Sequence, residues 1–191
     1  MIRLTLVCNA STAATRQGAF PADEPLDARG LKEATDSAKA LKPAGRALVS
    51  PALRAMQTAE ALGLSATPDD DLRDIDYGRW SGFSLTDIAS REAVAVGTWL
   101  ADPEAAPHGG ESIAALFVRV GRFMEARLDE EGNLVAVTHA AVMRAAIALA
   151  MGAPASSFWR IDVAPLGRAL LHGAAGRWRL RSLGTEMFSR G

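Results

Sequence analysis

The sequence has very little cysteine and lysine: Cys8 is the only cysteine, and Lys32, Lys39 and Lys42 are the only lysines. A single cysteine cannot form an intrachain disulfide and does not support a cysteine-based zinc site. The formal net charge is −1, so no overall positive charge attracts the chain to nucleic acid or to an anionic membrane. We therefore expect neither nucleic acid nor a membrane as a partner.

Long apolar runs are also missing. The apolar stretch 142–151 is too short to span a bilayer, and Arg144 interrupts it. The N-terminal stretch MIRLTLVCNAS lacks the longer apolar segment and the cleavage signal of a secretory peptide. These absences favour a cytoplasmic protein.

What is present is an alternation of strand-like and helix-like segments. Strands are predicted at 2–7, 47–49, 134–138, 161–163, 169–172 and 178–183, with a hairpin turn at 173–176. Helices are predicted at 28–41 (ended by Pro43), 51–62, 112–128 and 140–151, with two more around 85–100. The polar segment 68–83 is predicted to be a long loop. This alternation, with its β-rich end, predicts one α/β domain over residues 1–191 with a mostly parallel sheet.

Candidate functional residues follow the predicted strands, because ligands of such sheets bind beyond the carboxyl ends of the strands. The loops there contain Cys8-Asn9-Ala10, Ser50-Pro51 and Thr138-His139-Ala140. Arg54 lies in the first turn of the helix after the second loop. A helix N-terminus, an arginine and a histidine together favour an anion site. From its position alone, His139 is either a ligand-binding residue or a hydrogen-bonded core histidine.

Five segments, in the same order along the chain, resemble motifs of the histidine phosphatase superfamily, the phosphoglycerate mutase-like proteins. SPALRAMQTAEALG is similar to S-P-x-x-R-A-x-Q-T-A, and EPLDARG is similar to P-L-T-x-x-G. LRDIDYGRWSG is similar to L-x-E-x-D-F-G-x-W-E-G, HGGES to P-G-G-E-S, and VAVTHAAVMRA to V-x-V-S-H-G-x-x-x-R. The resemblance implies a three-layer α/β/α sandwich with a phosphate pocket at the carboxyl end of the sheet. The chemistry of that family needs no metal or other cofactor.

The resemblance also implies a phosphohistidine mechanism. In that mechanism the histidine of an R-H-G motif attacks phosphorus, and an acidic residue protonates the leaving group. The motif positions place the acid at Asp74, with Asp76 as the alternative, the second histidine at His139 and the helix arginine at Arg54.

Three further positions are expected at the substrate. The resemblance places Cys8 where the family has a phosphate-binding arginine, and we also expect Thr12 in the pocket. His108 precedes the Gly-Gly turn and is expected either near the mouth of the pocket or as a solvent-facing loop residue.

The R-H-G motif is where the chain departs from the family, because its positions read Cys8, Asn9 and Ala10. The lone pair of an amide nitrogen is delocalised, so Asn9 cannot form a phosphoenzyme, although it can donate a hydrogen bond to phosphate. By analogy with protease knockouts, losing a covalent nucleophile lowers kcat by a factor on the order of 10⁶. We therefore expect a phosphomonoester hydrolase-type protein that is weak or inactive. The alternative is a non-catalytic pseudophosphatase that binds a phosphoester or a partner.

Other interpretations stay open at this stage. Cys8 could act as the nucleophile, as in the cysteine phosphatases, whose C-x5-R loop needs an arginine at a fixed distance after the cysteine. The first arginine after Cys8 is Arg16, which lies two residues beyond that position. Arg16 could instead replace the cation lost at position 8. Asn9 is either natural or an introduced substitution for histidine. The expected ligand is a phosphorylated small molecule or phosphate, and the sequence predicts neither its identity nor the oligomeric state.

Overall fold

A computed structural model describes residues 1–41 and 45–184, and it contains one six-stranded sheet with the strand order β3-β2-β4-β1-β5-β6. The strands are β1 (Ile2–Cys8), β2 (Arg46–Val49), β3 (Ala66–Pro68), β4 (Gly132–Thr138), β5 (Arg168–Ala174) and β6 (Arg177–Gly184). The first four strands in this order are parallel, β5 is antiparallel to β1, and β6 is antiparallel to β5. The predicted, mostly parallel sheet is confirmed.

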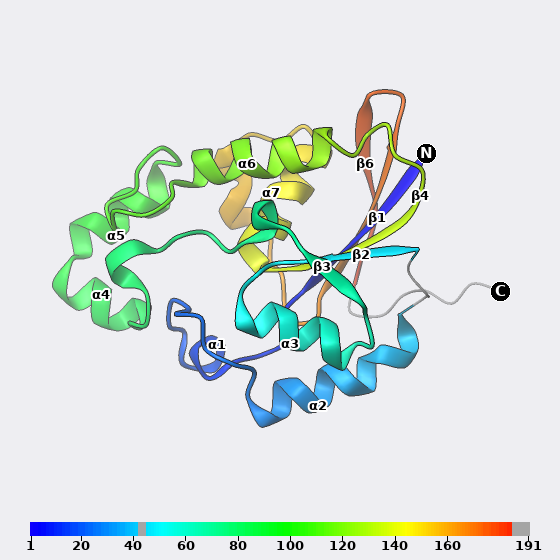
Figure 1. The fold of residues 1–191 in the computed structure, drawn as a ribbon. Helices are drawn as coiled ribbons and strands as arrows, with labels where there is room; N and C mark the ends of the chain where they lie inside the picture. The colour runs from blue at the N-terminus through cyan, green and yellow to red at the C-terminus, as the bar shows by residue number, and fades with distance from the viewer. Residues whose placement is uncertain (42–44, 185–191) are drawn as a thin grey trace.

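Helices cover both faces of this sheet (Figure 1). One face carries α2 (Ala28–Ser37) and α3 (Leu53–Ala61), and the other carries α6 (Ile113–Glu125) and α7 (Ala140–Ala150). The short helices α1 (Ala13–Gln17), α4 (Leu85–Arg91) and α5 (Ala93–Ala101) lie beyond the ends of the strands. Short 3-10 turns occupy Ala38–Ala40, Asp70–Leu72, Gly78–Trp80 and Ala155–Arg160. The architecture is the expected three-layer α/β/α sandwich.

The central strands are apolar because both of their faces are buried. Leu4 and Leu6 of β1 pack into the larger core, under α6 and α7, whereas Val7 packs into the smaller core with residues of α3. In α6 the apolar positions fall on one stripe, and Ser112 caps the helix by accepting a hydrogen bond from the Ala115 N–H at 3.1 Å. The sequence pattern therefore places α6 against the sheet with its polar side outward.

Several predicted elements differ from the observed ones. Residues 161–163 do not form a strand, so that prediction is wrong: β1 already pairs with β4 and β5 on its two sides, and no position in the sheet interior is left. The segment is instead an unpaired connection before β5. The helix predicted at 28–41 ends at Ser37 and continues as a 3-10 turn, and Pro43 lies outside the described residues.

Close backbone contacts at two glycines position the loops at the carboxyl end of the sheet. A Cβ on Gly30 would lie 2.2 Å from the Ser11 carbonyl oxygen, and a Cβ on Gly110 would lie 2.1 Å from the Asp76 carbonyl oxygen. Only glycine permits such approaches without moving the backbone. Gly30 therefore lets α2 pack against the loop after β1, and Gly110 lets the 108–112 loop pack against the loop that carries Asp74.

Candidate active site

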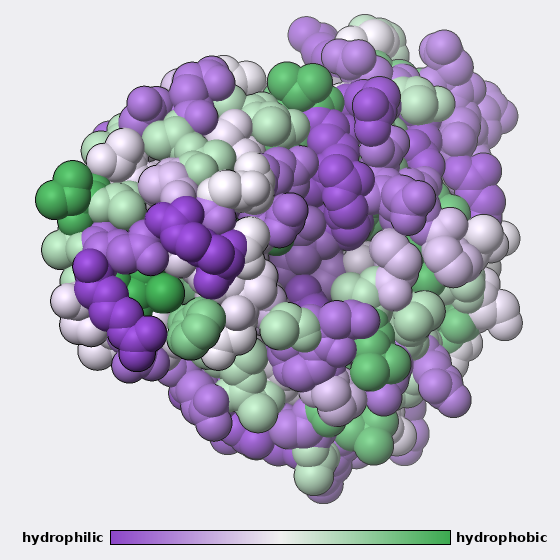
Figure 2. Space-filling model, turned by 60° about the vertical axis from the view of Figure 1, so that its left-hand side comes forward, coloured by the Kyte–Doolittle hydropathy of each residue, from purple (hydrophilic) through white to green (hydrophobic). Residues whose placement is uncertain are grey.

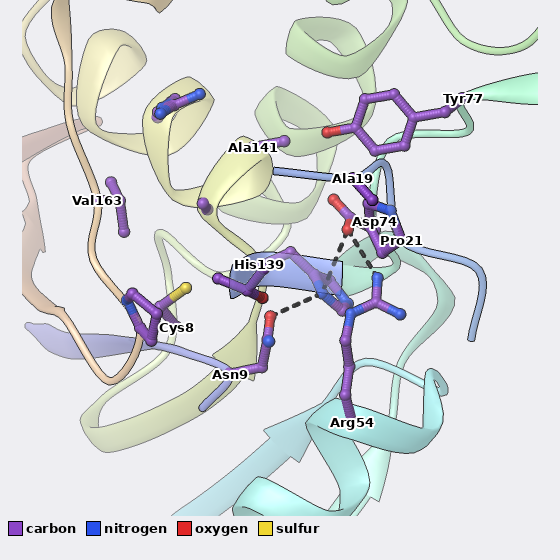
Figure 3. A pocket seen from close by; sticks show the side chains of 14 residues that line it. Cys8, Asn9, Ala19, Pro21, Arg54, Asp74, Tyr77, His139, Ala141 and Val163 are labelled. Carbon is purple, nitrogen blue, oxygen red and sulfur yellow. Dashed lines mark hydrogen bonds and ion pairs between the residues drawn. The ribbon is translucent and has the colours of Figure 1, made fainter. Parts of the chain in front are cut away.

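Asn9 and His139 lie side by side because the strands before them are paired in register. Cys8, the last residue of β1, pairs with Thr138, the last residue of the parallel strand β4. The Asn9 N–H donates to the Thr138 carbonyl oxygen at 2.7 Å, which extends this pairing past the end of β1. The two side chains therefore emerge together at the carboxyl edge of the sheet (Figure 3).

The imidazole of His139 is held from both ring nitrogens. Its Nδ1 lies 3.0 Å from Asn9 Oδ1, and its Nε2 lies 2.7 Å from the Ser50 hydroxyl oxygen. An amide oxygen only accepts, so Nδ1–H donates to Asn9, and Nε2 of the neutral ring accepts from Ser50. The Asn9 Nδ2 group donates to the Ala10 carbonyl oxygen at 2.9 Å. No lone pair of this histidine is free to attack a ligand.

Burial keeps His139 neutral. The residue is 1% exposed, and burial lowers its pKa from the ordinary 6.5 to about 4, although the nearby Asp74 carboxylate acts in the opposite direction. At neutral pH the ring is therefore a hydrogen-bond donor and acceptor, and it is not a cation.

Arg54 and Asp74 form the charged part of the site. Arg54 Nη2 donates to Asp74 Oδ2 at 2.7 Å, and the same carboxylate oxygen lies 3.5 Å from His139 Nδ1. Asp74 Oδ1 accepts from the Ile75 N–H at 2.9 Å. These contacts join a guanidinium, a carboxyl group and the Asn9–His139 pair into one cluster (Figure 3).

A second arginine fixes the loop that carries Asp74. Arg119 donates to both carboxylate oxygens of Glu111, at 2.8 and 2.6 Å. It also donates to the carbonyl oxygens of Asp71 and Arg73, at 2.8 and 2.9 Å. Arg119 is 4% exposed. Its hydrogen bonds link α6 to the loop that carries Asp74.

The cluster lines a cavity of about 190 Å³. The cavity is lined by Cys8, Asn9, Thr15, Ala19, Pro21, Arg54, Asp74, Tyr77, His139, Ala140, Ala141, Arg144, Val163 and Pro165. The face of the molecule in Figure 2 has a hollow near its centre, with hydrophilic residues around much of it. A cavity of this size, with two arginines in its wall, can hold a small anionic ligand.

Cys8 lies in this cavity as a neutral thiol. Burial, with a smaller contribution from the Asp74 carboxylate, raises its pKa to about 12. The thiolate is the nucleophilic form of cysteine, and it is absent at neutral pH with such a pKa. The structure therefore gives no support to Cys8 as a nucleophile.

Some residues expected at the site lie elsewhere. Thr12 caps α1 and donates to Glu24 at 2.8 Å, and Thr15 of the same helix lines the cavity in its place. Asp76 accepts from the Gly78 N–H at 2.8 Å within its own turn and does not line this cavity. Arg16 pairs with Asp27 at 2.9 Å, so it is not the cation that replaces position 8.

His108 is buried, but it does not line the cavity. It packs among the rings of Tyr77, Trp80 and Trp99, and its Nδ1 accepts from the Gly110 N–H at 3.0 Å. His108 therefore lies neither at the pocket mouth nor in solvent, because its ring packs in the aromatic cluster that includes Trp99 of α5.

Two residues of the site were missed by sequence reasoning, whereas Ser50 belongs to a loop that the sequence already placed at the carboxyl edge of the sheet. Arg144 is the arginine of the H-x4-R segment, so it had a motif signal. Tyr77, which stands in the D-F-G part of another motif, also lines the cavity. Those signals identified the family but did not show which side chains face the ligand.

The described residues provide neither a metal site nor a membrane-spanning helix. Within 1–41 and 45–184, no group of at least three His, Cys, Asp or Glu side chains is placed to hold a metal ion. Within the same ranges, no helix has the length and apolar character needed to cross a bilayer.

Comparison with known proteins gives a consistent result. The family model of the histidine phosphatase superfamily (branch 1) matches residues 4–186. Phosphoserine phosphatase 1 of Hydrogenobacter thermophilus is 28% identical over 183 residues, covering 90% of this chain and 87% of that protein.

Solved structures show the same likeness. A putative alpha-ribazole-5'-P phosphatase from Escherichia coli is 26% identical with a TM-score of 0.87, and the match covers 99% of both chains. A mycobacterial glucosyl-3-phosphoglycerate phosphatase, solved with VO3, is 25% identical with a TM-score of 0.84, and the match covers 94% of this chain and 96% of that one.

Proposed function

Because this chain belongs to the histidine phosphatase superfamily, we propose that its cavity binds phosphomonoesters and that Asn9 leaves their hydrolysis slow or absent. The observation that carries the proposal is the position of Asn9, which follows β1 and contacts His139 within the cavity lining. The fold and the pocket thus support a phosphatase-type ligand, while the residue beside His139 cannot form a covalent phosphohistidine.

The remaining groups suit a transferring phosphoryl group. The Arg54 guanidinium supplies a fixed positive charge, and the neutral His139 ring would donate its Nδ1–H to a phosphoryl oxygen in place of Asn9 Oδ1. Charge on the equatorial oxygens of phosphorus is stabilised by such preorganised donors. Asp74 would act as the acid that protonates the leaving oxygen, since its carboxyl group lines the cavity beside Arg54.

A non-catalytic role is the second candidate, and the hydrogen bonds of His139 favour it. Both ring nitrogens are already bonded within the protein, to Asn9 and Ser50, so the site is complete without a covalent step. In this case the protein would bind a phosphorylated small molecule or a partner, and no turnover would follow.

The test is the Asn9→His variant with an aryl phosphate as substrate. We expect its kcat to exceed that of the unchanged protein by several orders of magnitude, because a histidine at position 9 supplies the missing nucleophile. Asn9→Gln is the matched control, since it changes the side chain but adds no ring nitrogen. Its rate should stay at the level of the unchanged protein.

The two candidates separate in the same experiment. If Asn9→His is as inert as Asn9→Gln but both still bind inorganic phosphate, the site is a binding site and the first candidate is wrong. If the unchanged protein already turns over rapidly, the proposed loss of catalysis is wrong. Trapping a phosphorylated Asn9→His protein, and no phosphorylated Asn9→Gln protein, would identify position 9 as the attacking residue.

A further inference from the structure

Arg144 is a cation in the cavity wall that the phosphate cluster does not use. It lies on α7, and it lines the cavity together with Cys8, Val163 and Pro165. No hydrogen bond or ion pair joins it to Asn9, Asp74 or His139 among the described residues.

The guanidinium of Arg144 is poorly paired. Its Nε atom is buried without a hydrogen-bond partner in the described part of the chain. Its only carboxylate neighbour there is Asp162, at 3.7 Å from Nη2, and the side chain of Asp162 is 99% exposed. A solvent-exposed pair of this length contributes little, and a better anion can displace it. Arg144 therefore has donors available for a ligand.

Aromatic rings fix the position of this cation. The Arg144 Cζ atom lies 5.4 Å from the centre of the Phe158 ring and 5.8 Å from that of Trp159. Contacts with aromatic rings restrict the side chain, so that less rotamer freedom is lost when a ligand binds. The arginine is both held in place and incompletely satisfied.

Arg144 and Arg54 serve different ends of the cavity. Figure 3 shows Arg54 with Asp74 on one side, and Cys8 with Val163 on the other. Arg144 belongs with the second group, because its Nη2 atom lies 3.7 Å from the carboxylate of Asp162, the residue directly before Val163. A ligand that fills the cavity would therefore contact one arginine at each end.

The surroundings of Arg144 determine which anion fits there. It is the one cation at that end of the described cavity lining, and its neighbours in the lining include Ala140, Ala141, Val163 and Pro165. A single planar guanidinium pairs well with a planar carboxylate that carries one negative charge. A phosphate dianion would keep oxygens unpaired against this apolar wall, which is unfavourable.

We propose that Arg144 binds a carboxylate of the ligand, so that the cavity selects phosphomonoesters that also carry a carboxylate group. This inference rests on the proposed phosphate site at Arg54 and His139, and it adds the second point of attachment.

The test compares two ligands that differ only in that group: O-phosphoserine and phosphoethanolamine. Binding of each to the unchanged protein is measured by titration calorimetry near neutral pH. We expect phosphoserine to bind about tenfold more tightly or better, since a charge-assisted pair is worth at least that factor. Equal affinities for the two ligands would overturn the inference while leaving the phosphate site intact. If neither ligand binds, the proposed phosphate site itself is wrong.

Substitutions at Arg144 test whether this residue causes the preference for phosphoserine. Arg144→Gln should lower the affinity for phosphoserine to that for phosphoethanolamine and leave the latter unchanged. Arg144→Lys should retain part of the preference, because an ammonium group keeps the charge but loses the planar fork. Arg160→Gln, an exposed arginine on the adjacent 3-10 turn, is the control and should change neither affinity. An equal loss of both ligands in Arg144→Gln would show a structural role and overturn the inference.

Discussion

Arg54 and Arg119 are both buried, and each pairs with a carboxylate near the same loop, yet their hydrogen bonding differs. Arg119 donates from all three of its nitrogens, to Glu111 and to backbone carbonyl oxygens. Arg54 donates from Nη2 to Asp74, and its other N–H groups have no partner within residues 1–41 and 45–184. The protein provides acceptors for all three guanidinium nitrogens of Arg119. The guanidinium of Arg54 lines a cavity and keeps N–H groups that a ligand can use.

The difference separates a structural arginine from a ligand-binding one. A buried charge whose donors are all satisfied stabilises the segments that it joins, and a ligand can gain nothing from it. A buried charge with free donors has been desolvated without full compensation, and an anion supplies what is missing. The two sites should therefore respond in opposite ways to substitution: one in stability, the other in binding.

The largest expected effect is on stability, at Arg119. Arg119→Met should lower the free energy of unfolding by about 3–5 kcal/mol, because it leaves Glu111 buried without its partner. Chemical denaturation measures this loss. Arg122→Met, one turn away on α6 and mostly exposed, is the control and should cost no more than about 1 kcal/mol. Similar losses of unfolding free energy in both variants would contradict the conclusion that the hydrogen bonds of Arg119 stabilise the fold.

The next effect is the pH dependence of stability. It should differ between the two arginines, because the hydrogen-bonded cluster of Arg54 and Asp74 includes His139, whereas the partners of Arg119 include no histidine. The folded-state pKa of His139 is lowered to about 4, below the value of about 6.5 in the unfolded chain. The unfolded state therefore binds the proton first, and the stability falls as the pH falls from about 6.5 to about 4. The full loss from this one group is on the order of 3 kcal/mol.

Denaturation curves across that pH range test this expectation. His139→Gln should lose less stability on acidification than the unchanged protein, while Arg119→Met should keep the full dependence. Carboxylates titrate in all of these proteins, so the difference between the curves isolates the histidine. Parallel curves for His139→Gln and the unchanged protein would contradict the lowered pKa.

The smallest effect is on binding, at Arg54. Arg54→Gln should weaken the binding of inorganic phosphate by about 10- to 150-fold, which corresponds to about 1.5–3 kcal/mol for a charge-assisted contact. Its free energy of unfolding should fall by less than that of Arg119→Met. Calorimetric titration with phosphate measures the affinity, and an unchanged affinity would remove Arg54 from the proposed site.

Elements with strong periodicity were predictable from the sequence. The apolar runs of β1 and β4 and the stripe of α6 follow directly from burial on two faces or on one. The strand β3 has only three residues, and α1 only five, so neither carries enough pattern to be recognised. Residues 161–163 have the composition of a strand, but pairing depends on a free neighbour in the sheet, which composition does not encode.

The candidate site was predictable to the same extent. Asn9 and His139 were placed together because parallel strands end at one edge of a sheet. The positions of Thr12 and His108 depend on contacts with Glu24 and with a cluster of rings, and these contacts come from distant parts of the chain. Arg144 was visible in a motif, but only the folded chain brings it to the same cavity as Val163 and Pro165.

The pairing of Cys8 with Thr138 also has a genetic consequence. Because the strand register, and not the side chain, fixes where position 9 emerges, a histidine there would meet His139 without any change of backbone. An asparagine codon becomes a histidine codon when only its first base changes. A library of random point mutants, grown with a phosphate ester as the sole phosphorus source, would therefore reach that variant in a single step.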